Sequence, residues 1–226
     1  ATSQINLGVM YRTGKGVPKD NRKAAEFYNK AATQGNAMAQ TYLATMYEYG
    51  EGVDKNINKA IELYLMAAEQ GFSRAQLSIA NIYFDGSGVA VDYSKAINWY
   101  EKAANDGQAN AKMNLGYMYE NGMGVEKDLK KAFNLYYEAA KQGFDAAQYN
   151  VGIMYENGTG ITQNLEEAIE WFNKAADQGN IEAKNRLIYL HDFKIASSLK
   201  YNKTLLSKIL PGKTLCFVTV KKQQGN

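Results

Sequence analysis

Few residue types in this chain could carry out catalysis or bind a metal ion. Its 226 residues include one histidine, His191, and one cysteine, Cys216. His191 could act as a general base, but the sequence pattern places no serine or cysteine nucleophile beside it. A single cysteine also excludes a disulfide within the chain and a cluster of cysteine and histidine ligands for a metal. We therefore predict no catalytic residue, no cofactor and no metal site.

Pairs of glycines separated by one residue could also bind a ligand, because glycine-rich loops can hold phosphate groups. Such a pair recurs every 36 residues, at Gly14 and Gly16, Gly50 and Gly52, Gly86 and Gly88, Gly122 and Gly124, and Gly158 and Gly160. The pairs lack GxGxxG spacing, follow no predicted strand and carry no GK[ST] sequence. A turn that ends a helix and needs positive φ angles is the better interpretation.

The constant 36-residue period predicts a solenoid, in which each repeat is one supersecondary unit that packs on its neighbours. In the reference repeat, residues 37–72, two apolar sets have the i, i+4, i+7, i+8 spacing of a helix face. The sets are Ala39, Leu43, Met46 and Tyr47, then Ala60, Tyr64, Ala67 and Ala68. We expect Gly50 to end the first helix and Gly71 the second, as residues with left-handed backbone conformation.

An Asx residue before the second helix of every repeat predicts an N-cap, since its side-chain oxygen can accept a free backbone N–H. These residues are Asp20, Asn56, Asp92, Asp128 and Asn164. The period divides the chain into five full repeats and the first helix of a sixth; the repeats are 1–36, 37–72, 73–108, 109–144 and 145–180, and the sixth helix is 181–193. Because residue 1 already lies within a repeat, we expect the native chain to continue upstream.

Residues 194–226 leave the repeat pattern. Their apolar residues from Ile195 to Leu210 predict an amphipathic helix over the last repeat, and residues 215–220 a short strand or a loose apolar stretch. This tail holds seven lysines and no acid, so residues 1–193 carry a net charge of −4. A mildly acidic body argues against nucleic acid as a partner. The basic tail could contact an anionic membrane surface weakly. No apolar run is long enough to span a bilayer.

The repeat resembles a known family through the segments AQYNVGIMYENGTG, residues 147–160, and EAIEWFNKAADQG, residues 167–179. It is similar to the Sel-1-like repeat, a 36-residue relative of the tetratricopeptide repeat, over residues 1–193. The resemblance implies an all-α, right-handed superhelix of helix-turn-helix units that works as a scaffold or adaptor. Some cysteine-rich members have been linked to β-lactam binding, and this chain lacks their cysteines.

In such solenoids one side of the first helix of each repeat lines a concave groove. The corresponding residues here differ from repeat to repeat and mix aromatic, apolar and acidic types, which suits capture of a basic or amide-rich peptide. The candidate binding residues are Glu48, Tyr49, Arg74, Leu77, Asn81, Phe84, Asp85, Met113, Tyr117, Glu120, Tyr149, Ile153 and Glu156. Packing between adjacent helices is the alternative for any one of them.

We therefore expect a non-enzymatic interaction module that binds a protein or peptide on its concave face. Two alternatives remain open from the residues. One is a regulatory repeat region of a larger enzyme or signalling protein, and the other is a hydrolase of the β-lactam-binding kind. The lack of a disulfide framework favours a reducing compartment only weakly, because a secreted helical repeat can also do without disulfides.

Overall fold

A computed structural model describes residues 1–200 of the chain, with side chains up to Asp192. Over this part the chain forms eleven α-helices and no strand. The helices are α1 (Thr2–Thr13), α2 (Asn21–Ala32), α3 (Ala37–Tyr49), α4 (Ile57–Glu69), α5 (Ser73–Asp85), α6 (Tyr93–Asn105), α7 (Ala109–Asn121), α8 (Leu129–Lys141), α9 (Asp145–Asn157), α10 (Leu165–Asp177) and α11 (Ile181–Lys200).

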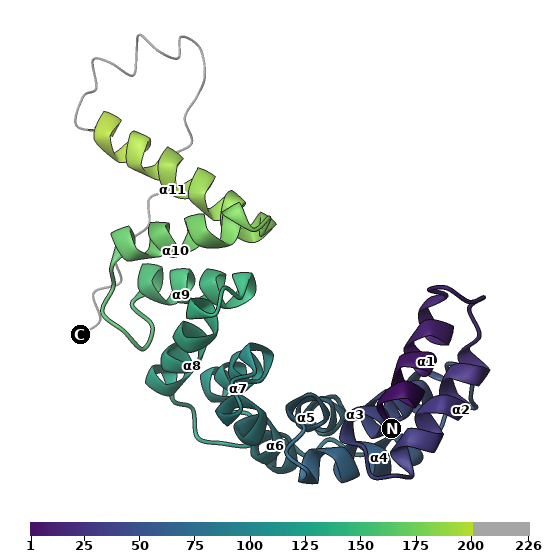
Figure 1. Cartoon of the computed structure of the whole chain (residues 1–226). Coiled ribbons are helices and arrows are strands. Elements are labelled where there is room, and N and C mark those ends of the chain that lie inside the picture. Colours follow the sequence, from purple (N-terminus) through teal and green to yellow (C-terminus); the bar gives the residue numbers. More distant parts are fainter. Residues whose placement is uncertain (201–226) are drawn as a thin grey trace.

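The helices pair into antiparallel hairpins that stack in chain order, each helix packing on those before and after it. The stack bends, so that α3, α5 and α7 lie on its inner side while α4, α6 and α8 lie on its outer side (Figure 1). The buried apolar residues of the described part form three clusters that follow one another along the stack between the two layers, as expected of a solenoid. The predicted all-α solenoid is confirmed.

The predicted helix ends are confirmed in every full repeat. Gly50 caps α3 with φ 73°, and its N–H donates to Met46 O at 2.8 Å. The Asn56 side chain accepts from Lys59 N at 3.0 Å at the start of α4. Asp20, Asp92, Asp128 and Asn164 cap their helices in the same way. The loop is closed by a backbone bond from Asn56 N to Tyr47 O at 2.9 Å, so the glycine pair serves as a turn.

The second glycine of each pair has a further role from the second repeat onward, because it contacts the preceding hairpin. A Cβ on Gly160 would lie 2.2 Å from Leu129 O, at the start of α8. No hairpin precedes Gly16 among the described residues, and the nearest atom to its added Cβ would be Met10 Cε at 3.4 Å. Glycine at this position is therefore required by the interface between repeats as well as by the turn.

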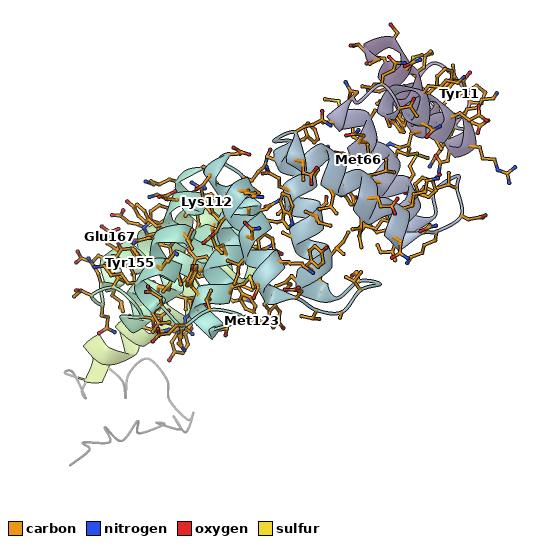
Figure 2. All side chains as sticks on the ribbon, turned by 90° about the horizontal axis from the view of Figure 1, so that it is seen from below. Tyr11, Met66, Lys112, Met123, Tyr155 and Glu167 are labelled. Carbon is orange, nitrogen blue, oxygen red and sulfur yellow. The ribbon has the colours of Figure 1, made fainter. Side chains whose placement is uncertain are left out.

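Each full hairpin buries an aromatic ring at the same position of its second helix, namely Tyr28, Tyr64, Tyr100, Tyr136 or Phe172. Tyr64 is 1% exposed, and Leu43 and Met46 of the same hairpin are also buried. The fourth residue predicted for the core of α3, Tyr47, is only half-buried, and Lys59 Nζ lies 4.4 Å from its ring centroid. The corresponding Tyr155 instead lies near Glu167 (Figure 2). Burial is the main cause that raises the pKa of Tyr155, and the negative charge of Glu167 is the second.

Helix α11 differs from expectation in length, since it continues to Lys200 instead of ending at residue 193. The repeat period set the predicted end, but no glycine or proline occurs there to stop a helix. Its predicted core residues Ala183 and Leu190 are buried, and Leu187 is half-buried. The predictions for the chain beyond residue 200, including Cys216 and the strand at 215–220, lie outside the described residues. Within residues 1–200 no helix combines the length and apolar character needed to cross a membrane.

Candidate functional site

The thirteen residues predicted for the concave groove differ widely in exposure. Four are exposed, namely Tyr49, Arg74, Asp85 and Tyr117. Eight are half-buried, namely Glu48, Leu77, Asn81, Phe84, Met113, Glu120, Tyr149 and Ile153. One, Glu156, is buried. The half-buried majority indicates that this wall is partly packed by the chain's own side chains.

Tyrosine hydroxyls from the outer helices reach the inner wall and bind its acids. Tyr64 Oη donates to Glu48 Oε2 at 2.7 Å and lies 2.9 Å from Thr45 Oγ1. Tyr136 Oη donates to Glu120 Oε2 at 2.8 Å in the same register. Burial, above all, raises the pKa of Tyr64 and of Tyr136, because it disfavours the phenolate. Each hydroxyl therefore stays a neutral donor that fixes the carboxylate beside it.

The third repeat replaces this pair with an amide network, because Phe84 stands where the neighbouring repeats have glutamate. Tyr100 Oη donates to Asn81 Oδ1 at 2.7 Å, and Asn114 Nδ2 donates to both at 3.2 Å. The Phe84 ring lies 6.3 Å from the rings of Tyr100 and Tyr117, measured between centroids. Asn81 and Phe84 therefore join neighbouring helices as much as they face solvent.

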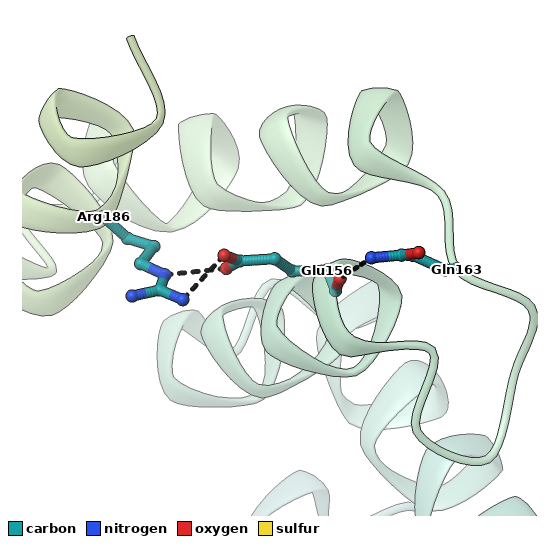
Figure 3. A network of polar contacts seen from close by, with 3 residues as sticks. All are labelled: Glu156, Gln163 and Arg186. Carbon is teal, nitrogen blue, oxygen red and sulfur yellow. Dashed lines mark hydrogen bonds and ion pairs between the residues drawn. The ribbon is translucent and has the colours of Figure 1, made fainter. Parts of the chain in front are cut away.

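Glu156 is the one predicted binding residue that is buried instead of lying at the surface of the wall. Its side chain is 9% exposed, and Arg186 of α11 holds both of its oxygens (Figure 3). Arg186 Nε donates to Oε2 at 2.7 Å and Nη2 donates to Oε1 at 2.6 Å, which raises the pKa of the guanidinium. Gln163 Nε2 donates to the backbone oxygen of Glu156 at 2.8 Å. This carboxylate is already neutralised and cannot serve a ligand as a free acid.

We expect Arg186→Ala to lower the free energy of unfolding by about 1–2 kcal/mol, because it leaves a buried carboxylate without its cation. The value is below that of a fully buried pair, since the Arg186 side chain is 34% exposed and partly screened. Urea denaturation followed by circular dichroism measures the change. Arg74→Ala removes an exposed arginine of the same wall and is the control; equal losses in the two variants would contradict the assignment.

Four of the predicted residues, Glu48, Tyr49, Asn81 and Asp85, converge on one pocket between α3 and α5. Its volume is about 580 Å³. The remaining lining residues are Thr45, Lys55, Ile57, Tyr64, Ser78, Ile82, Ser87 and Gly88. The other predicted residues lie outside it. Ser78 was missed because its helix position was not counted as part of the wall, although a small residue where other repeats have Tyr42, Asn114 and Arg186 was a signal.

The pocket carries unbalanced negative charge. Glu48 is half-buried, and it accepts a hydrogen bond from the neutral Tyr64 hydroxyl. Asp85 is exposed and makes no ion pair or hydrogen bond within the described residues. The Glu48 charge raises the pKa of Tyr49, whose side chain stands 66% exposed at the same place. Lys55 is the one cation among the lining residues, against two carboxylates.

The stacked hairpins and the pocketed inner wall define an all-α solenoid repeat protein. The chain belongs to the Sel1 repeat family, whose model matches residues 1–36, 37–72, 73–108, 109–144 and 145–180. Proteins of this family are generally non-catalytic scaffolds that bind other proteins. No curated protein matches this chain.

The solved structures that are similar to this chain include two that are more than 30% identical to it. One is a protective antigen of uropathogenic Escherichia coli strains that displays an SLR fold, with 37% identity and a TM-score of 0.83 over 86% of this chain. This chain spans 42% of the length of that protein. The other is a Sel1 repeat protein from Oxalobacter formigenes, with 35% identity and a TM-score of 0.76 over 82% of this chain and 74% of its own.

Proposed function

We propose that this chain is a non-enzymatic scaffold that binds a segment of a partner protein along its concave face. The observation that carries the proposal is the pocket between α3 and α5, which residues from the inner wall of two successive repeats build together. A cavity of this size accepts one or two side chains of a partner. The regulatory and hydrolase alternatives gain no support from His191, which is exposed and whose charged neighbour, at 3.8 Å, is Asp192.

Exposed side chains on the inner helices support binding of a peptide. Tyr49 is 66% exposed, Tyr117 is 48% exposed and Met38 is 41% exposed, all on inner helices. Tyrosines supply large, rigid contact area with a polar tip, and they are enriched among the residues that dominate binding energies. The core residues keep their type from repeat to repeat while these wall residues change. Such variation is what a surface that fits one particular partner requires.

We expect the double change Tyr49→Ala and Tyr117→Ala to weaken peptide binding about tenfold or more, because each tyrosine loses contact area worth about 1 kcal/mol or above. Both side chains are exposed, so helicity should not change, and the unfolding midpoint should fall only slightly through loss of the edge contact between Tyr117 and Phe84. Phe84 is unsuitable for this test because its ring packs on Tyr93, Tyr100 and Tyr117.

The measurement is isothermal titration of peptides selected on the wild-type chain from a randomised library. Met66→Ala is the matched control, because Met66 is 50% exposed on the outer helix α4 (Figure 2). Binding that survives the double change but is lost with Met66→Ala would place the binding surface on the outer side. A library that yields no specific peptide at all would remove the proposal.

A further inference from the structure

The repeats contain an internal example of how a cation binds to the inner wall. Glu48 and Glu156 occupy the same position of their repeats, 108 residues apart in the 36-residue register. The residue 30 positions after Glu156 is Arg186, whose guanidinium takes both carboxylate oxygens. The residue 30 positions after Glu48 is Ser78, which lines the pocket. Ser78 therefore stands where the last hairpin has an arginine.

The pocket lies in the space that an arginine side chain from Ser78 would enter. Serine is short, and the cavity of about 580 Å³ next to Glu48 has Ser78 on its wall. Tyr64 Oη already binds Glu48 Oε2, which leaves Oε1 as an acceptor. Asp85 contributes a second carboxylate to the same cavity. The N–H groups of a guanidinium in this pocket would thus have two carboxylates as acceptors, Glu48 and Asp85. Among the described residues, the guanidinium of Arg186 has only the Glu156 carboxylate.

We propose that this pocket binds the guanidinium of an arginine side chain presented by an extended segment of the partner protein. The inference rests on the proposed peptide-binding function and names the chemical group that anchors it. A guanidinium fits better than an ammonium, because its planar fork of donors can bridge carboxylate oxygens and its face can stack on the exposed Tyr49 ring. The half-buried Glu48 carboxylate gains the countercharge that Arg186 gives Glu156.

The first test asks whether a guanidinium fits, and it needs no ligand. Ser78→Arg should raise the urea midpoint of unfolding, because the new side chain fills the pocket and pairs with Glu48. The same change in a Glu48→Gln chain should give no rise, since the carboxylate is absent. Asn150→Arg places an arginine 30 positions after Glu120 and leaves the pocket empty, so it is the control for the binding test that follows. An equal loss of stability from Ser78→Arg in both backgrounds would overturn the inference.

The second test measures selectivity with peptides chosen from a randomised library on the wild-type chain. We expect arginine to be enriched at one position, and replacement of it by citrulline, which keeps the shape and loses the charge, to weaken binding about tenfold or more. Lysine at that position should bind more weakly than arginine. Ser78→Arg and Asp85→Asn should each weaken binding, while Asn150→Arg and Glu62→Gln, an exposed acid of α4, should leave it unchanged.

The outcomes separate the two proposals. Peptides that bind the concave wall, with no preference for arginine and no response to Ser78→Arg, would overturn the arginine pocket and leave the scaffold function in place. A library that gives no binder would remove the scaffold function and the arginine pocket together. Equal weakening by Asn150→Arg and Ser78→Arg would also overturn the assignment, because it would show a response to added positive charge anywhere on the wall.

Discussion

Gly160→Ala should destabilise the chain by about 2–5 kcal/mol, the sum of a left-handed backbone strain of about 1–2 kcal/mol and overpacking of about 1–3 kcal/mol. Gly160 has φ 71°, which is unfavourable for any residue with a Cβ. The added methyl would also meet the backbone of α8, with Leu129 O at 2.2 Å and Leu129 C at 2.6 Å. Because these are backbone atoms, the two hairpins would have to separate to make room.

Gly16→Ala is the matched control for this prediction. It stands at the same position of the first repeat with φ 76°, but the nearest atom to the added methyl is the mobile end of Met10 at 3.4 Å. We expect a loss of about 1–2 kcal/mol, from backbone strain alone. Urea denaturation of both variants gives the difference, and equal losses would show that the contact between hairpins contributes nothing.

Raising the pH from about 9 to about 11 should remove roughly 4 kcal/mol of stability, about 1.4 kcal/mol for each of three buried tyrosines. Burial raises the pKa of Tyr64, Tyr100 and Tyr136 far above the ordinary value of 10.0. Below pH 10 both the folded and the unfolded chain keep these protons. Above it the unfolded chain releases them while the folded chain retains them, so the stability falls as the pH rises.

Urea midpoints across this pH range, read together with the ultraviolet absorbance of phenolate, measure the effect. Tyr136→Phe should reduce the alkaline loss by about a third, since one of the three phenols is gone. Phe172 already fills the same position in the fifth repeat, so a ring without a hydroxyl fits the fold. Phenolate absorbance that appears before unfolding would contradict the assignment of these hydroxyls as buried.

The fold could be predicted from the sequence because the residues that begin and end its helices recur five times at the same spacing. Gly50 and Asn56 act through their own backbone neighbours, so the sequence alone determines what they do. The end of α11 could not be predicted in the same way. The 36-residue period shows where the repeat sequence stops, but the backbone hydrogen bonds of the helix continue beyond that point. Tyr47 packs on the core as its spacing predicted, but it stays half-buried, because helical spacing gives the face on which a residue lies and not how fully other helices cover it.

The candidate site was predictable in part. Helical spacing brought Glu48, Tyr49, Asn81 and Asp85 to one wall, and these residues do share a pocket. It could not show that Glu156 is neutralised, because Arg186 comes from another hairpin. It also treated the wall as one layer, whereas the Tyr64 hydroxyl crosses from the outer helix to bind Glu48. Pairings between helices depend on the third dimension, which a pattern within one helix does not contain.

The hydroxyl of Tyr64 has a consequence for how such a wall can diversify. Glu48 takes its orientation from a side chain that is rooted in α4, behind the surface that a ligand would touch. A substitution in α4 that shifts the Tyr64 ring would change the orientation of the Glu48 carboxylate. Every residue at the mouth of the pocket would keep its identity. Preference for a ligand can therefore drift through changes that a comparison of mouth residues alone would overlook.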